Sequence, residues 1–150
     1  MMLFFYEKKE SESFVKESVY KKTEYYLYNY RNIDDKIDEI RERIIESVNI
    51  STYSHLIGKN SVEEQAIKLA DNRKIYNLRK AKTVIAHYLK VFKSRNSKRY
   101  EFIKMKYFDK ASPLEIKRVL GYSDKQQTDI TNMVVSFFYK QFKKAGIGGM

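Results

Sequence analysis

Apolar side chains recur at helical spacing through most of the chain, which predicts an all-α fold. Residues 13–47 contain no proline or glycine, and apolar or neutral residues follow one another there at alternating intervals of four and three. This is the heptad spacing of a long helix that packs against another helix. The heptad seam consists of Val19, Thr23, Tyr26, Tyr30, Ile33, Ile37, Ile40 and Ile44.

The pattern leaves two partners open for this seam. One is an antiparallel pairing, within the same chain, with the helix expected to begin at Ser61. The other is a second copy of the chain, in which case residues 19–44 form a coiled-coil arm that makes a homodimer. The narrow and regular seam favours self-association slightly, although threonine and tyrosine are poor residues for such a seam.

A break in the pattern divides the chain into two parts. Residues 49–60 are rich in Ser, Thr, Asn and Gly, which predicts a linker. We therefore expect a helical arm with its linker over residues 1–60 and a second unit over residues 61–150. Ser61 and Glu64 have the spacing of a capping box, and a helix is expected from there to about residue 95. Its expected inward side chains are Ile67, Ile75, Leu78, Ala81, Ile85, Leu89 and Phe92.

A polar stretch over residues 94–98 separates this helix from the next one. Ser97 is a candidate cap for a helix over residues 98–108, whose apolar residues can pack against the following segment. These apolar residues are Phe102, Ile103, Met105 and Tyr107.

Residues 112–131 have the pattern of two short helices joined by a tight turn. Ser112 can cap the first helix, Pro113 suits its first position, and Glu115 has capping-box spacing. Ile116, Val119 and Leu120 then fall on one face and are expected to make its apolar contacts.

The turn between these two helices has residues suited to ending one and starting the other. Gly121 can adopt the left-handed conformation that ends a helix, and Ser123 can cap the next helix, with Gln126 three residues later. Two capped helices around a short turn predict a helix-turn-helix unit, although any small helical domain can contain an ordinary hairpin of this kind.

The last helix is expected to bury an apolar side made of Ile130, Met133, Val134, Phe137 and Phe138. Lys143 and Lys144 suit its negative end. The final five residues, GIGGM, are expected to be frayed.

Charge is distributed unevenly along the sequence. The chain has a net charge of +11, with −2 over residues 1–50, +9 over residues 51–100 and +4 over residues 101–150. A basic part next to a neutral or acidic part is expected of a protein that binds nucleic acid.

Catalytic, metal and membrane chemistry have little support in the sequence. There is no cysteine, and the two histidines, His55 and His87, lie far from any ligand cluster. No glycine-rich phosphate loop or nucleophile elbow occurs. We expect no enzyme, no cofactor and no metal, although a metal-dependent nuclease stays an alternative. No apolar run approaches the ~20 residues of a membrane span, so no membrane contact and a cytoplasmic location are expected.

The motifs of residues 99–144 resemble a known family. They are an I-x-x-x-Y-F helix from Ile103 to Phe108, an E-I-x-x-x-L-G-Y-S core from Glu115 to Ser123, and Ile130. This segment resembles the fourth region of bacterial sigma factors, and more closely the sigma-like C-terminal part of phage late-gene regulators of the ArpU and RinA type. The resemblance implies a sequence-specific, DNA-binding transcriptional regulator, an activator of phage or mobile-element late genes.

Residues that read DNA follow from the resemblance and from base chemistry. The positions implied by the family are Asp124, Lys125, Gln126, Thr128 and Asp129, and Asn132 is added because it falls on the same side. Lysine suits guanine acceptors, glutamine suits adenine, and threonine can contact a thymine methyl group. Gln127 occupies a position that is usually apolar in the family.

Basic residues around the two short helices are expected to bind the phosphates of the DNA backbone. The expected phosphate-binding residues are Lys104, Lys106, Lys110, Lys117, Arg118, Ser123 and Lys140. A small reader contacts few base pairs, so double-stranded DNA is expected together with RNA polymerase or with a second copy. The alternative function is a DNA-recognition or structural subunit of a phage packaging assembly.

Overall fold

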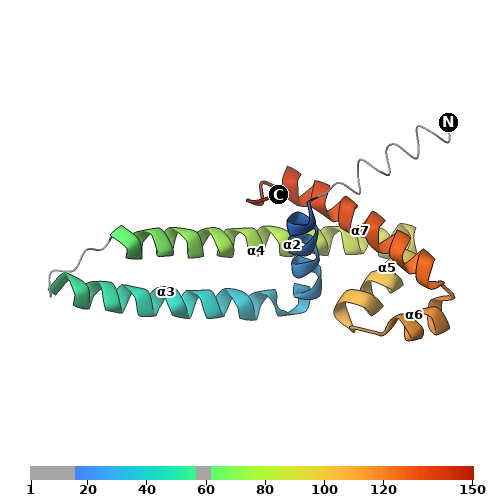
Figure 1. Ribbon diagram of the computed structural model, residues 1–150, viewed down its shortest axis with the longest axis horizontal. Coiled ribbons are helices and arrows are strands. Elements are labelled where there is room, and N and C mark those ends of the chain that lie inside the picture. The colour runs from blue at the N-terminus through green and yellow to red at the C-terminus, as the bar shows by residue number, and fades with distance from the viewer. Residues whose placement is uncertain (1–15, 57–61) are drawn as a thin grey trace.

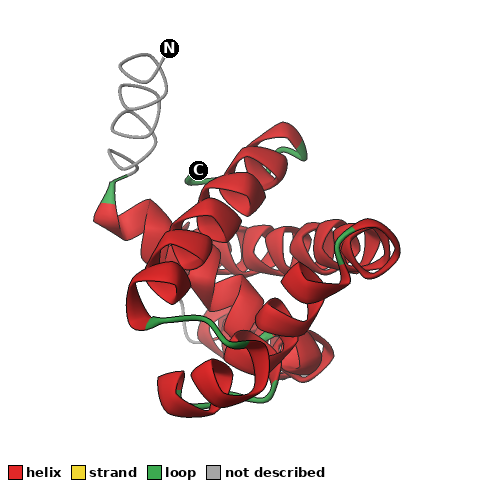
Figure 2. Cartoon of the chain, turned by 90° about the vertical axis from the view of Figure 1, so that its right-hand side faces the viewer, coloured by secondary structure: helices red, strands yellow, loops and turns green. Residues whose placement is uncertain are grey.

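A computed structural model describes residues 16–56 and 62–150, and these residues form helices joined by short connections (Figure 1). No strand occurs among them, so the all-α prediction is confirmed for this part of the chain (Figure 2). In chain order the elements are α2 (Glu17–Tyr28), η1 (Tyr30–Asn32), α3 (Ile33–Leu56), α4 (Val62–Arg95), α5 (Ser97–Ile103), η2 (Lys104–Phe108), α6 (Pro113–Leu120) and α7 (Asp124–Lys144).

The two longest helices set the shape of the molecule. Figure 1 shows α3 and α4 running antiparallel as a long hairpin, with α2 crossing the pair and α7 lying over the C-terminal part of α4. Helices α5 and α6 gather at the end of the molecule away from the α3–α4 connection. The candidate DNA-reading unit therefore lies at one end of an elongated helical body.

The heptad seam does not lie on one continuous helix as expected. Helix α2 ends at Tyr28, and a 3₁₀ turn over Tyr30–Asn32 redirects the chain into α3. The side chain of Asn29 donates to the Tyr25 carbonyl at 2.8 Å, and the backbone N–H of Asn32 donates to the Asn29 carbonyl at 2.8 Å. Asparagine side chains compete with helical hydrogen bonds in this way, so a helix can end inside an unbroken apolar pattern.

The seam is buried within a single chain. Thr23, Tyr26, Ile33, Ile37 and Ile40 are all buried, and Tyr30 and Ile44 are partly buried against the same core. Of the two partners left open by the sequence, the α3 half of the seam faces α4 of its own chain. Because these side chains are already covered within one chain, this part of the seam over residues 19–44 is not available to pair with a second copy.

The expected linker over residues 49–60 is wrong over its first part, because α3 continues to Leu56. Ser, Thr and Asn have weak helix preferences that a long helix can accommodate. Residues 57–61, which include the expected Ser61 cap, lie outside the described residues.

Helix α4 ends at Arg95, as predicted, and buries most of its expected inward residues. Ile67 is an exception, because 53% of it is exposed. Phe92 is only partly buried, against the edge of the core.

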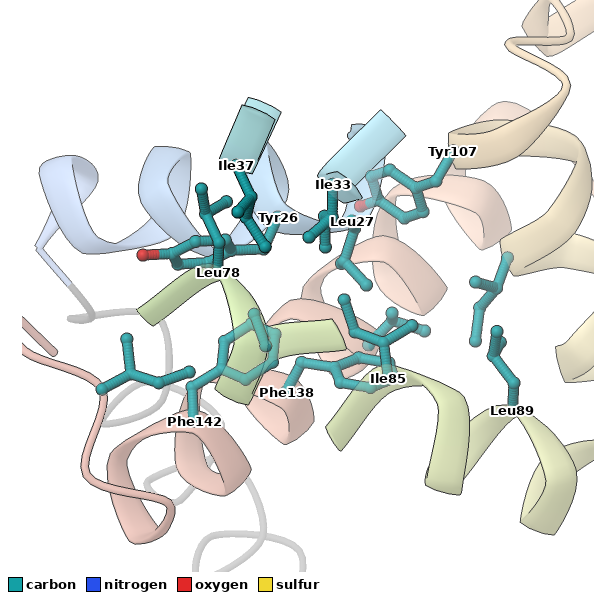
Figure 3. Packing of buried hydrophobic residues seen from close by; sticks show 14 of the residues in the cluster. Tyr26, Leu27, Ile33, Ile37, Leu78, Ile85, Leu89, Tyr107, Phe138 and Phe142 are labelled. Atoms are coloured by element: carbon teal, nitrogen blue, oxygen red, sulfur yellow. The ribbon is translucent and has the colours of Figure 1, made fainter. Parts of the chain in front are cut away.

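One hydrophobic core connects the hairpin to the C-terminal helices (Figure 3). Ile37, Leu78 and Ile85 belong to the same buried cluster as Phe138 and Phe142 of α7, so the core is continuous across the expected boundary at residue 60. On the expected apolar side of α7, Val134 and Phe138 are fully buried, Ile130 and Phe137 are partly buried, and Met133 is 51% exposed. Each buried side chain of this size contributes about 1.5–3 kcal/mol to the free energy of folding.

The C-terminal tail is not frayed as expected. Ile147 is buried within the core cluster, and both backbone polar groups of Gly148 are hydrogen-bonded. Its carbonyl accepts from Lys22 Nζ at 2.6 Å, and its N–H donates to Asn77 Oδ1 at 3.2 Å. The apolar isoleucine within the glycine-rich tail explains the docking, since its burial fixes the residues on both sides.

Among the described residues, no helix combines the length and the apolar character required to cross a membrane.

Candidate nucleic-acid interface

The segment before the α6–α7 pair is fixed by a helix cap and by a contact with α2. Asn96, and not Ser97 as expected, caps α5, with Oδ1 accepting the Arg99 N–H at 3.2 Å. The helix then widens into a π-helical segment, η2, where Tyr107 is fully buried. Its hydroxyl donates to Glu24 Oε2 of α2 at 2.8 Å. Burial, reinforced by the nearby Glu24 carboxylate, raises the pKa of Tyr107 far above its ordinary value, so this hydroxyl stays protonated.

Helix α6 begins and ends where the sequence predicts, but only one of the two bonds of the expected Ser112–Glu115 capping box is present. Ser112 Oγ accepts the Glu115 N–H at 3.2 Å, and Pro113 occupies the first turn. Gly121 has φ +75°, the left-handed conformation that ends a helix at little cost for glycine. Of the expected apolar face, Ile116 is buried and Leu120 is partly buried. Val119 is 67% exposed, so its expected packing role is wrong.

The start of α7 also has the predicted geometry. Ser123 Oγ accepts the Gln126 N–H at 3.2 Å, and Gln126 Oε1 accepts the Ser123 N–H at 2.9 Å, which completes the capping box. Tyr122 packs edge-on against Phe102, with 6.0 Å between ring centroids. The Lys98 ammonium group lies 4.6 Å from the centroid of the Tyr122 ring. The turn is therefore packed against α5 and not merely a flexible connection.

Gln127 joins the two helices and was not recognised from the sequence as a functional residue. It is 7% exposed, and its Nε2 donates to the Pro113 carbonyl at 2.9 Å and to the Tyr122 carbonyl at 3.0 Å. One side chain thus connects the start of α6, the turn and the start of α7. The polar residue at an otherwise apolar position was the signal in the sequence, but its acceptors could not be identified without the structure.

Most of the expected base-reading side chains lie on the surface. Asp124, Lys125, Gln126, Thr128 and Asn132 are exposed. Asp129 is partly buried.

At least four of these six residues interact with other groups of the chain, Asp129 among them. Gln126 is engaged in the cap, Thr128 Oγ1 donates to the Asp124 carbonyl at 3.1 Å, and Asn132 Oδ1 accepts from Tyr20 of α2 at 2.9 Å. Lys125 has no ion-pair partner within residues 16–56 and 62–150. Its ammonium group is therefore available to an acceptor outside the chain.

A surface groove of about 360 Å³ runs along one side of α7. Asp124, Thr128 and Asn132 line it together with Lys106 of η2 and Tyr20 of α2. The structure thus brings one expected phosphate ligand next to three expected base readers. Tyr20 comes from a part of the chain that the sequence did not connect with this site.

The other expected phosphate ligands lie around the unit at different distances. Lys110, Lys117, Arg118 and Ser123 are exposed near α6 and the turn, and Lys104 is partly buried in η2. Lys140 is exposed further along α7, about 23 Å from Lys125 at 1.5 Å per residue, and does not belong to the same cluster. Lys98 was missed, although it lies over the Tyr122 ring at the turn.

No cluster of three or more His, Asp or Glu side chains that could hold a metal ion occurs in the part of the chain that the structure describes.

Comparison with known proteins identifies no relative. No model of a protein family matches the sequence, and neither the curated proteins nor the solved structures include a significant match.

Proposed function

We propose that the protein binds double-stranded DNA and reads the major groove with the N-terminal half of α7. The observation that carries the proposal is the joined pair of helices α6 and α7. Both helices are capped, the turn has a left-handed glycine, and Gln127 fixes one helix on the other. A rigid helix that projects polar side chains is the geometry of a helix-turn-helix reader.

Lys125 is the proposed central base contact, because its ammonium group is exposed at the first turn of α7. It suits the O6 and N7 acceptors of guanine. Thr128 and Asn132 follow on one side of the helix, where Lys106 lies beside them in the same groove. Gln126 can bind adenine N6 and N7 together only if the hydrogen bond between its Oε1 and the Ser123 N–H breaks. It is therefore a weaker base reader than the sequence suggested.

Phosphate binding is assigned to cations around this helix. Lys106, Lys110, Lys117 and Arg118 surround α6 and the turn, and Lys98 adds a cation at Tyr122. With about six phosphates neutralised, affinity should fall about a thousandfold between 50 and 200 mM salt. Asp124 and Asp129 repel phosphate, so the cations on both sides of α7 are needed to hold the duplex.

The narrower proposal is transcriptional regulation of phage or mobile-element late genes. It is supported by the resemblance of residues 99–144 and by the size of the reader, which requires a further contact for useful specificity. RNA polymerase is the partner favoured for that contact, because most of the heptad seam expected to pair with a second copy is buried within one chain.

Fluorescence anisotropy with a labelled duplex selected from a random library tests the proposal. Lys125→Ala should weaken binding to the selected duplex by about 1–3 kcal/mol and relax the preference at one base. Lys117→Ala should weaken binding to all duplexes alike. Arg41→Ala is the matched control, because Arg41 is an exposed cation of α3. Figure 1 shows α3 extending away from α6 and α7.

Two outcomes would contradict the proposal. One is selection that yields no preferred sequence, together with equal affinities for the original protein and Lys125→Ala. The other is equal loss of affinity in Lys125→Ala and Arg41→Ala, which would indicate attraction by overall charge instead of a reading helix.

A further inference from the structure

A second site lies where α2 crosses the α3–α4 hairpin. A cavity of about 420 Å³ opens between these three helices, which is within the ~300–1,000 Å³ of small-molecule sites. The buried Tyr26 and Leu78, both labelled in Figure 3, line its apolar side. None of the expected DNA-reading residues lines this cavity.

Cations dominate the polar part of the lining. Lys22 comes from α2, Lys36 and Arg43 from α3, and Lys74 from α4, whereas Glu39 is the single carboxylate among the lining residues. Four positive side chains from three helices converge on one cavity, which concentrates positive potential there. The four cations outnumber the two nearby carboxylates, Glu39 in the lining and Asp71 behind it, and this excess favours an anionic ligand.

A buried carboxylate outside the lining orients one of these cations. Asp71 has a side chain only 5% exposed, and its two oxygens accept from Arg43 Nε at 3.2 Å and Nη2 at 3.0 Å. Lys74 Nζ lies 4.0 Å from the same carboxylate. Because the bidentate contact fixes the plane of the guanidinium group, Nη1 of Arg43 keeps its N–H groups for another acceptor.

A buried donor at the cavity wall is an independent observation. Asn77 is 6% exposed and lines the cavity, and its Oδ1 accepts the Gly148 N–H at 3.2 Å. This contact assigns the oxygen and the nitrogen of the amide, so Nδ2 is the remaining donor. Nδ2 has no acceptor among the described residues. Buried amide donors are rarely left without a partner, and an acceptor in the cavity would satisfy this one.

We propose that this cavity binds a small phosphorylated molecule of nucleotide size. Phosphate oxygens are acceptors for the arginine, lysine and amide donors, and arginine matches them in planar geometry. The exposed ring of Tyr25, 44% accessible on the cavity rim, offers an aromatic face for a base. The volume exceeds what a phosphate group alone requires, which favours a nucleotide over the bare ion.

Isothermal titration of the full chain with ATP, pyrophosphate and adenosine at low salt tests this site. We expect saturable binding of one ATP per chain, weaker binding of pyrophosphate, and no measurable binding of adenosine. Asn77→Asp keeps the acceptor for Gly148 and replaces the donor with a negative oxygen, so it should weaken ATP binding at least tenfold. Lys74→Gln, at an exposed side chain, should weaken it severalfold without affecting folding. Lys90→Gln is the matched control, an exposed lysine of α4 outside the cavity.

The results separate this proposal from the DNA-binding proposal. Absence of saturable ATP binding, or equal ATP binding in Asn77→Asp, Lys74→Gln and the original protein, would overturn it. So would a loss of duplex binding in Lys74→Gln without any effect on ATP, since the cavity would then contact the DNA backbone. Failure of Lys125→Ala to change DNA binding would leave the ATP measurements unaffected, because Lys125 is not part of this cavity.

Discussion

Replacement of Gln127 by leucine tests the connection between α6 and α7 most directly. The change removes two hydrogen bonds, to the carbonyls of Pro113 and Tyr122, at a site that is 7% exposed. Each such bond contributes about 0.5–1.5 kcal/mol to stability, so their loss together costs about 2 kcal/mol. Leucine restores part of this by burying apolar surface, which leaves an expected net loss of about 1–2 kcal/mol.

Urea unfolding followed by circular dichroism measures this loss as a lower midpoint at unchanged slope. Thermal unfolding should show a decrease in Tm of roughly 2–8 °C for a chain of this length. Gln65→Leu is the matched control, since Gln65 is exposed on α4 and its replacement should change stability by less than about 0.5 kcal/mol. If Gln127→Leu is as stable as the original protein, or more stable, Gln127 does not join the helices through these bonds.

Three further predictions concern stability. Gly121→Ala should lower the free energy of unfolding by about 1–2 kcal/mol, because φ +75° strains any residue with a Cβ. The added Cβ itself meets no atom within 4 Å, so the loss comes from the backbone conformation. An unchanged urea midpoint would contradict the left-handed turn. Ile85→Ala should cost about 2–5 kcal/mol and Ile67→Ala less than about 0.5, and equal losses would mean that Ile67 is buried after all. The free energy of unfolding should fall as pH rises above 10.0, the ordinary tyrosine pKa, because burial raises the folded-state pKa of Tyr107 and raises that of Tyr26 to about 12. Above that pH the folded state keeps protons that the unfolded state releases. Urea unfolding at pH 9 to 11 checks this, since the decline should be smaller in Tyr107→Phe.

The features predicted most accurately from the sequence are those that depend on contacts between residues close together in the chain. The ends of α6 and α7 depend on Ser112, Gly121 and Ser123, whose capping partners lie within four residues. Such signals are visible in sequence because they require no knowledge of the rest of the fold. The inward face of α4 was also predicted well, since helical spacing alone identifies one side of a long helix.

Contacts between distant segments account for what the sequence did not predict. The heptad spacing continues through residues 29–32, so the pattern alone could not show that α2 turns away from α3. Ile67 follows the apolar spacing of α4 but lies near its N-terminal end, where it remains 53% exposed.

Prediction of the candidate sites from the sequence was limited for the same reason, because they depend on contacts between distant residues. The contact of Tyr20 with Asn132 joins residues 112 positions apart, and only the fold brings them together. Asp71 and Asn77 are polar residues on a basic helix and had no distinctive spacing. Their importance depends on Arg43 of α3 and Gly148 of the tail, which are far from them in sequence.

The position of α2 has a consequence for the order of assembly during synthesis. Its buried face meets residues close to the C-terminal end: Tyr26 packs on Phe142 at 5.5 Å between ring centroids, and Lys22 binds Gly148. The α3–α4 hairpin joins neighbouring segments and can form early, whereas α2 is fully covered only once α7 has left the ribosome. Helix α4 and η2 can cover part of this tyrosine-rich helix first, and completion of the last helix covers the rest.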